Sequence, residues 1–113
     1  MKRPLSYTEI KRASKKGSGG AVTEYIIRRK KYGGNLGYIK FQEGGIKDHM
    51  DVNGVTNENL LQIVIDRLRC FQKGKYPCEE NECALAYCNN ALKMLELRTK
   101  ERIQRGVEGK ETK

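Results

Sequence analysis

The sequence has no tryptophan, two prolines and a single histidine, His49, among its 113 residues. It also lacks an apolar run near the roughly 20 residues that a membrane-spanning helix needs, since its longest, Leu60–Ile65, contains Gln62. The segment after Pro4 is polar, so no signal peptide is expected. A lone histidine without a nucleophile pattern is a weak catalytic base, and the glycine clusters match neither a Walker loop nor a dinucleotide fingerprint. We therefore expect an intracellular, soluble chain that is not an enzyme.

The four cysteines lack the CxxC pair that structural zinc sites prefer. Cys78, Cys83 and Cys88 are five residues apart, a spacing that on a helix turns each about 140° from the last. These side chains would point in different directions around the helix. The sequence therefore predicts free thiols used as small apolar side chains, with no metal and no cofactor.

Positive charge is concentrated in the first half of the chain. The net charge is +9; residues 1–47 hold 12 basic and 3 acidic side chains, whereas residues 48–113 hold 11 of each. A field of this sign favours partners that carry phosphate. A solvated basic segment that only confers solubility explains the charge equally well, so charge alone does not decide between these interpretations.

The first half of the sequence indicates a flexible basic segment over residues 1–20, followed over 21–55 by a small β region and a loop. Val22–Tyr32 is rich in β-branched and aromatic residues, a glycine turn follows, and Leu36–Gln42 alternates apolar and polar residues. This pattern predicts a β-hairpin. Because two strands alone are marginally stable in water, we expect the hairpin to pair with another subunit.

The second half predicts a helical hairpin over residues 56–106 and a frayed tail over 107–113. Thr56 is a candidate N-cap for a helix over 57–73, and Gly74 ends it. A second helix is expected from near Cys78 to Gln104. The apolar stripes expected to be buried are Leu60, Leu61, Val64, Leu68 and Phe71 in the first helix, and Ala84, Leu85, Cys88, Ala91, Leu92 and Leu95 in the second. The fold class is α+β.

Two arginines continue the inner face of the second expected helix. At about 100° per residue, Arg102 lies close to the direction of Leu95, Arg98 lies further round, and Asn81 lies on the same side one turn before the stripe begins. Guanidinium groups on an inner face need an anion, and their forked donors suit phosphate. The alternative is that packing stops after Leu97 and that the arginines are solvated and paired with Glu101 or Glu108.

Phe71 also allows two interpretations. It ends the apolar stripe of the first helix, which is typical of a core residue. An aromatic ring together with an arginine pair and an asparagine is also typical of a nucleotide site, where the ring stacks on the base and the guanidiniums bind phosphate.

Several stretches of the sequence resemble the phage Thoeris anti-defence signal sponges of the first type. The similarity covers roughly residues 36–111. The stretches that carry it are Gly44–Asn59, which contains the run Asp51–Glu58, and Asp66–Gln72, Glu80-Asn81 and Leu97–Gly109. The final stretch ends in an Arg-Gly-Val-Glu-Gly signature that is shared with the anti-CBASS sponges of phages. The chain departs from the family at Lys110-Glu111, where the signature often ends in Thr-His.

The resemblance implies a protein that sequesters a signal without degrading it. Such proteins bind glycocyclic ADP-ribose, a cyclic ADP-ribose isomer made by TIR-domain proteins, and so keep the Thoeris effector inactive in the cytoplasm of the infected bacterial host. They have a small β region and a helical hairpin, and they assemble as dimers or trimers of dimers. Some also hold cyclic di- or trinucleotides at separate sites. Carried onto this sequence, the ligand-binding pattern falls on Phe71, Asn81, Arg98 and Arg102.

A second hypothesis comes from the basic half of the chain. A strand ribbon over Tyr25–Tyr38 with the run Arg28-Arg29-Lys30-Lys31 is typical of a small nucleic-acid-binding protein. The resemblance disfavours this hypothesis, because the partners it implies are a small cyclic nucleotide and other copies of the chain, and not a nucleic acid. It implies no contact with a membrane.

Overall fold

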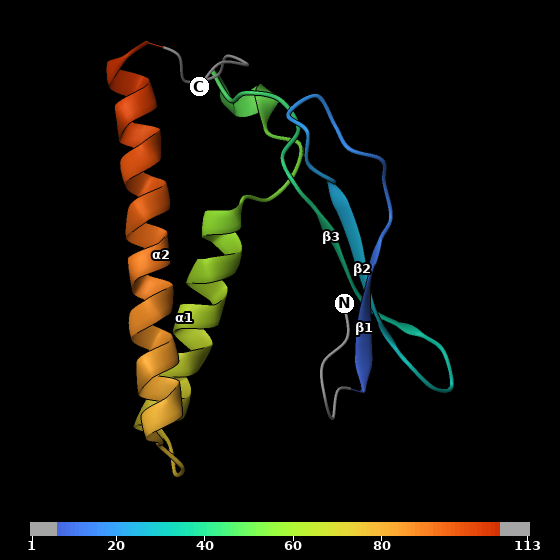
Figure 1. The fold of residues 1–113 in the computed structure, drawn as a ribbon, viewed down its shortest axis with the longest axis vertical. Helices are drawn as coiled ribbons and strands as arrows, with labels where there is room; N and C mark the ends of the chain where they lie inside the picture. The colour runs from blue at the N-terminus through green and yellow to red at the C-terminus, as the bar shows by residue number, and fades with distance from the viewer. Residues whose placement is uncertain (1–6, 107–113) are drawn as a thin grey trace. The chain divides into compact units, whose positions relative to one another are not determined.

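The computed structural model describes residues 7–106, which divide into two compact units between Val55 and Thr56. The first unit holds three strands and a short 3-10 helix, and the second holds two α-helices (Figure 1).

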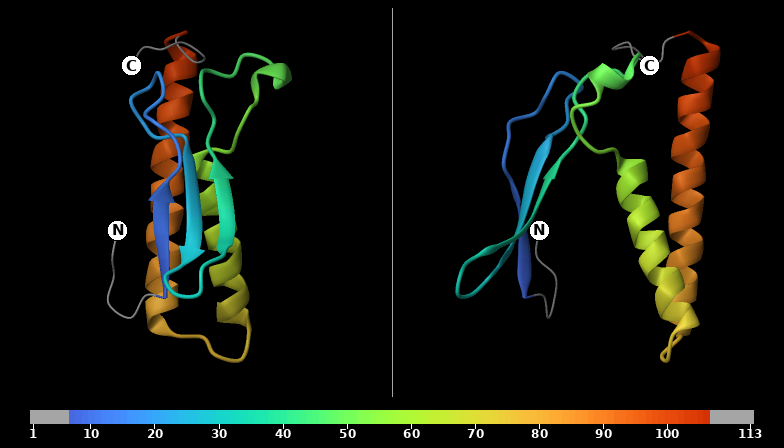
Figure 2. Two further views of the ribbon diagram at one scale, coloured as in Figure 1. Left: turned by 90° about the vertical axis from the view of Figure 1, so that its right-hand side faces the viewer. Right: turned by 180° about the vertical axis from the view of Figure 1, so that it is seen from behind.

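The first unit is built on an antiparallel sheet. The strands are β1 (Thr8–Arg12), β2 (Glu24–Arg29) and β3 (Asn35–Lys40), and they lie side by side in the order β1-β2-β3 (Figure 2, left panel). Ile10 is opposite Ile27, which in turn is opposite Gly37, and the register shifts between Ile27 and Arg28. The β2–β3 hairpin predicted from the sequence is confirmed.

Strand β1 is a correction to the two-stranded hairpin, because it lies in the segment expected to be flexible. All five of its residues pair with β2. Among them only Glu9 is half-buried, and the other four are exposed to solvent. The Ser14 hydroxyl accepts hydrogen bonds from the backbone amides of Thr23 and Glu24 at 3.0 and 3.2 Å, which holds the returning chain beside β2. Because the sheet has a third strand from the same chain, an unpaired hairpin is no longer a reason to expect an oligomer.

The segment after β3 is a hydrogen-bonded loop that contains the 3-10 helix His49–Asp51. The Gln42 amide bridges across it, donating to the Asp51 carbonyl at 2.9 Å and accepting from the Asn53 amide at 2.9 Å. Gly54 passes so close to β3 that a Cβ there would lie 2.4 Å from the carbonyl carbon of Phe41, so a side chain is excluded. His49 is exposed in this loop.

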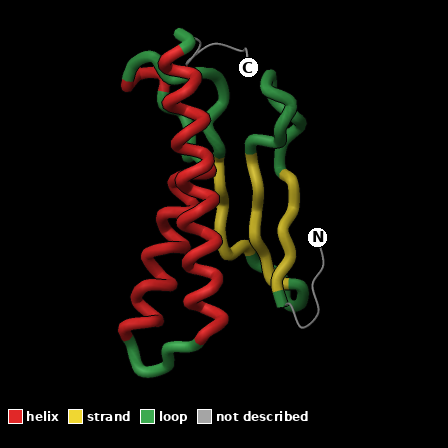
Figure 3. The backbone as a smooth tube through the Cα atoms, turned by 60° about the vertical axis from the view of Figure 1, so that its left-hand side comes forward, coloured by secondary structure: helices red, strands yellow, loops and turns green. Residues whose placement is uncertain are grey.

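The second unit is a two-helix hairpin made of α1 (Asn57–Lys73) and α2 (Glu79–Gln104), drawn in red in Figure 3. The predicted helices are confirmed, as is the Thr56 N-cap, whose side chain accepts from the Asn59 amide. Although α2 spans 26 residues, no helix among the described residues is both long and apolar enough to cross a membrane.

Burial along the helices differs from the predicted stripes in part. In α1 the most buried residue is Ile65, only 3% exposed, whereas Val64 and Phe71 are exposed; Ala91 of α2 is exposed as well. In α2 seven shielded positions follow steps of four and three, a heptad pattern typical of helices that pack along a seam. They are Asn81, Leu85, Cys88, Leu92, Leu95, Thr99 and Arg102, and the half-buried Ala84 and Asn89 flank them. The first and last residues of this seam, Asn81 and Arg102, are both candidate site residues.

Candidate functional site

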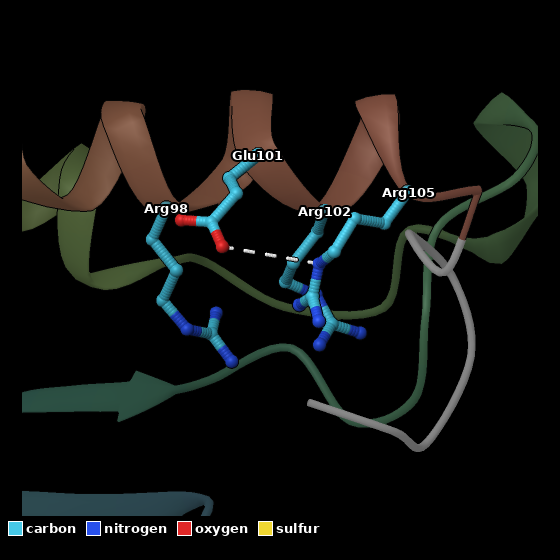
Figure 4. A pocket seen from close by; sticks show the side chains of 4 residues that line it. All are labelled: Arg98, Glu101, Arg102 and Arg105. Carbon is cyan, nitrogen blue, oxygen red and sulfur yellow. Dashed lines mark ion pairs between the residues drawn. The ribbon is translucent and has the colours of Figure 1, made fainter.

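The last two turns of α2 form a strongly cationic hollow. It has a volume of about 280 Å³ and is lined by Arg98, Glu101, Arg102 and Arg105. Figure 4 shows all four side chains projecting from the same side of the helix. The spacing explains this, because residues i, i+4 and i+7 of an α-helix share one face.

The two predicted arginines have different environments. Arg102 is 6% exposed and occupies the last position of the α2 seam, as expected from its direction on the helix. Arg98 is exposed and extends a second stripe through Tyr87, Ala91 and Met94, also exposed. The hollow is thus lined by one buried guanidinium and one exposed guanidinium, four residues apart.

Arginine dominates the lining of the hollow. Three arginines and one glutamate leave a net charge of +2 on its lining residues. The pair between Arg105 Nε and Glu101 Oε1 has a separation of 3.9 Å and is exposed, so it is a weak restraint. The C-terminal end of a helix favours cations, which helps α2 hold these arginines together without a ligand.

Phe71 lies at the opposite end of the helical hairpin, in the last turn of α1. Its side chain is 51% exposed, so the interpretation of Phe71 as a core residue is wrong for the single chain. The guanidinium carbon of Arg67 lies 5.4 Å from the ring centroid, in a cation–π contact between residues one turn apart. The aromatic ring is therefore presented at the surface, where a flat base could stack on it.

Asn81 lies at the same end, in the first turn of α2, and is half-buried. The turn between the helices is fixed by the Gln72 amide, which donates to the Cys78 carbonyl at 2.9 Å and accepts from the Cys78 amide at 3.1 Å. Glu79, Glu80 and Glu82 surround Asn81 in sequence, which complements the helix dipole. The Asn81 side chain therefore offers a neutral amide with which the edge of a base could form hydrogen bonds.

One chain does not bring the four predicted residues together. Phe71 and Asn81 flank the interhelical turn, whereas Arg98 and Arg102 lie near the far end of α2. Asn81 and Arg98 are 17 residues apart on one continuous helix, which corresponds to about 25 Å. A single small ligand cannot contact both pairs within one copy.

Glu101 and Arg105 were not predicted as site residues. From the sequence, Glu101 is expected only as a partner that could neutralise the arginines, and Arg105 only as the first residue of the Arg-Gly-Val-Glu-Gly signature. The signal that could have found both is their spacing from Arg98 and Arg102 on the helix face. Within residues 7–106, no three or more His, Cys, Asp or Glu side chains are grouped so that they could hold a metal ion, and all four cysteines are free.

Two comparisons show which known proteins this chain is similar to. Residues 35–100 match the family model described as the Acb2/Tad1 hairpin domain. The chain is also 42% identical, over 93 residues, to "Thoeris anti-defense 1" of Bacillus phage SBSphiJ7. That similarity covers 82% of this chain, which spans 63% of the length of the relative.

Proposed function

The chain belongs to the Acb2/Tad1 hairpin-domain family, and on this basis we propose that it is a phage anti-defence protein that sequesters a cyclic ADP-ribose signal. In this proposal glycocyclic ADP-ribose, made by TIR-domain proteins, is captured in the cytoplasm of the infected host. The Thoeris effector then receives no signal. The expected site residues are Phe71, Asn81, Arg98 and Arg102.

The observation that carries the proposal is the arginine-lined hollow at the end of α2. A cyclic ADP-ribose isomer contains a diphosphate, an adenine base and two riboses. Guanidinium groups present paired donors that match phosphate oxygens, and a buried one binds them more strongly than a solvated one. Arg102 is such a buried donor. The exposed ring of Phe71 and the amide of Asn81 supply what the base needs, namely a stacking surface and an edge partner.

We propose that two copies of the chain complete each site. Because the two pairs of residues lie at opposite ends of the helical hairpin, a second hairpin running antiparallel would place its Phe71 and Asn81 beside the first copy's arginines. A two-fold axis makes this contact reciprocal, so a pair of copies would hold two equivalent sites. Phe71 and Asn81 of one copy would then bind the base of each ligand, and Arg98 and Arg102 of the other copy would bind its diphosphate.

The surface of the helices supports such an assembly. Only Val22 and Ile65 are buried hydrophobic residues in the described part of the chain, and large apolar side chains remain exposed on both helices. Those on the helices include Ile63, Val64, Phe71, Tyr87, Met94 and Leu97. Large exposed apolar side chains that gather into a patch usually mark an interface. Dimers, or hexamers built from three dimers, are therefore the expected states, and cyclic di- or trinucleotides are further ligands that such an assembly could hold.

Binding without cleavage is expected because neither group of candidate residues contains a nucleophile with an adjacent base. The test is to incubate the protein with glycocyclic ADP-ribose, remove free ligand, denature the protein and analyse what is released by mass spectrometry. We expect intact ligand in amounts that approach one molecule per chain. Release of a linear product would mean an enzyme. Absence of bound ligand would contradict the proposed function, and a salt-sensitive affinity for polynucleotides in its place would favour the nucleic-acid hypothesis.

A further inference from the structure

The ring of Phe71 has a cation over one of its faces. Aromatic side chains in an α-helix point back toward the preceding turn, so this ring reaches the residue four positions earlier, which is Arg67. The guanidinium carbon of Arg67 lies over the ring, 5.4 Å from its centroid. Because both residues belong to α1, the contact exists within one helix and needs no second copy of the chain.

The contact lies on the exposed side of α1. At about 100° per residue, Arg67 and Phe71 point about 40° apart and away from Ile65, the buried residue of this helix. Both side chains are exposed, the ring by 51%. With one face covered by the guanidinium, the ring offers its other face to a ligand. A side chain that is held before binding also loses less conformational entropy when the ligand arrives.

We infer that Arg67 is a positioning residue of the base site, whose guanidinium holds the Phe71 ring in the orientation that presents its free face to the base. The inference rests on the proposed function, since it concerns the same site. Arg67 acts through the ring and not through contact with the ligand. The effect of removing Arg67 on affinity must therefore disappear when the ring itself is absent.

The experiment compares Arg67→Gln with Arg69→Gln by calorimetric titration with glycocyclic ADP-ribose. Arg69 is an exposed cation of the same helix, but it lies about 200° round the axis from Arg67. We expect Arg67→Gln to weaken binding about threefold, since a cation–π contact at an exposed site corresponds to a factor of about 2 to 5. Arg69→Gln should leave the affinity unchanged. In a Phe71→Ala background, Arg67→Gln should have no further effect.

A second readout follows the ring without any ligand. The sequence has no tryptophan, so Phe71→Trp introduces the only indole and makes its fluorescence specific to this position. In this background Arg67→Gln should lower the anisotropy of the indole, because the ring becomes more mobile, whereas Arg69→Gln should not change it. A purely structural role of Arg67 would instead lower the melting temperature and leave the anisotropy of the folded protein as it was.

Equal losses of affinity in Arg67→Gln and Arg69→Gln would overturn the inference, because Arg67 would then act only through net charge. A loss that persists in the Phe71→Ala background would also overturn it, since Arg67 would then contact the ligand directly. Unchanged affinity and anisotropy in Arg67→Gln would have the same meaning. Failure of the parent to bind glycocyclic ADP-ribose would instead reject the proposed function, and the anisotropy measurement, which needs no ligand, keeps the two failures distinguishable.

Discussion

Arg102→Ala is expected to weaken binding of glycocyclic ADP-ribose about 100-fold, and Arg98→Ala about 10-fold. A hydrogen bond to a charged group contributes about 1.5–3 kcal/mol, and the buried Arg102 should lie at the upper end of this range and the exposed Arg98 at the lower end. Calorimetric titration gives the affinities. Circular dichroism and the melting temperature report whether the fold is retained.

Because Arg102 is buried, its truncation to alanine also removes packing, so the prediction needs a gentler variant. Arg102→Lys keeps the charge and most of the stem but lacks the planar fork, and it should still lose about tenfold in affinity. Lys93→Ala, which removes an exposed cation from the middle of α2, serves as the control and should be neutral. If Arg102→Lys and Arg98→Ala both bind within twofold of the parent, the arginines are solvated and paired with glutamates, and the hollow is not the site.

Phe71→Ala is expected to weaken the same binding by a factor of about 5 to 100, because stacking of one base on an aromatic ring contributes about 1–3 kcal/mol. Phe71→Tyr and Phe71→Trp keep a π-face and should retain most of the affinity, whereas Phe71→Leu should behave like Phe71→Ala. Since the ring is half exposed in the single chain, the melting temperature should change little across the series. Affinity should therefore follow aromatic character and not side-chain volume.

Tyr76 offers a matched control for this series, because it is an exposed aromatic residue in the turn between the same helices. Tyr76→Ala should leave the affinity unchanged. The opposite ordering, in which Phe71→Leu binds better than Phe71→Trp and stability follows volume, would mean that Phe71 packs against protein in the assembled state. The stacking role would then be rejected, leaving Asn81 and the arginines as the only candidates.

The bounds of both helices could be predicted closely from the sequence, but the face of α1 that is buried could not. Thr56 and Gly74 mark the ends of α1 unambiguously, since one is an N-cap and the other stops the helix. Between them, apolar residues form two stripes, one through Leu61, Ile65 and Leu68 and another through Val64 and Phe71. Periodicity shows that both stripes exist, but it does not show which one is buried. Only the packed helical hairpin shows that the stripe of Ile65 is the buried one.

Strand β1 and the third arginine were missed for different reasons. Thr8–Arg12 has one apolar residue, Ile10, so it lacks the alternation that predicts a strand; backbone pairing with β2 and the Ser14 bonds hold it in place. Arg105 was missed because it directly follows the predicted end of the helix at Gln104, where helical periodicity no longer assigns a face. The position of Arg102 on the buried side of α2, in contrast, followed directly from the helical periodicity that begins at Asn81.

The central claim, a site completed by two copies, is tested most directly by mixing two defective variants. Phe71→Ala and Arg98→Ala damage opposite ends of the helical hairpin, and each proposed site takes one end from each copy. In a pair made of one copy of each variant, one site therefore contains both substitutions and the other site contains neither. After equimolar mixing with subunit exchange, random pairing should restore parental affinity at about one quarter of all sites. Mixing Arg98→Ala with Arg102→Ala, which damage the same end, should restore none. Calorimetric stoichiometry that shows no parental-affinity sites in the first mixture, or sedimentation of the parent as a 12.9 kDa monomer, would contradict the claim.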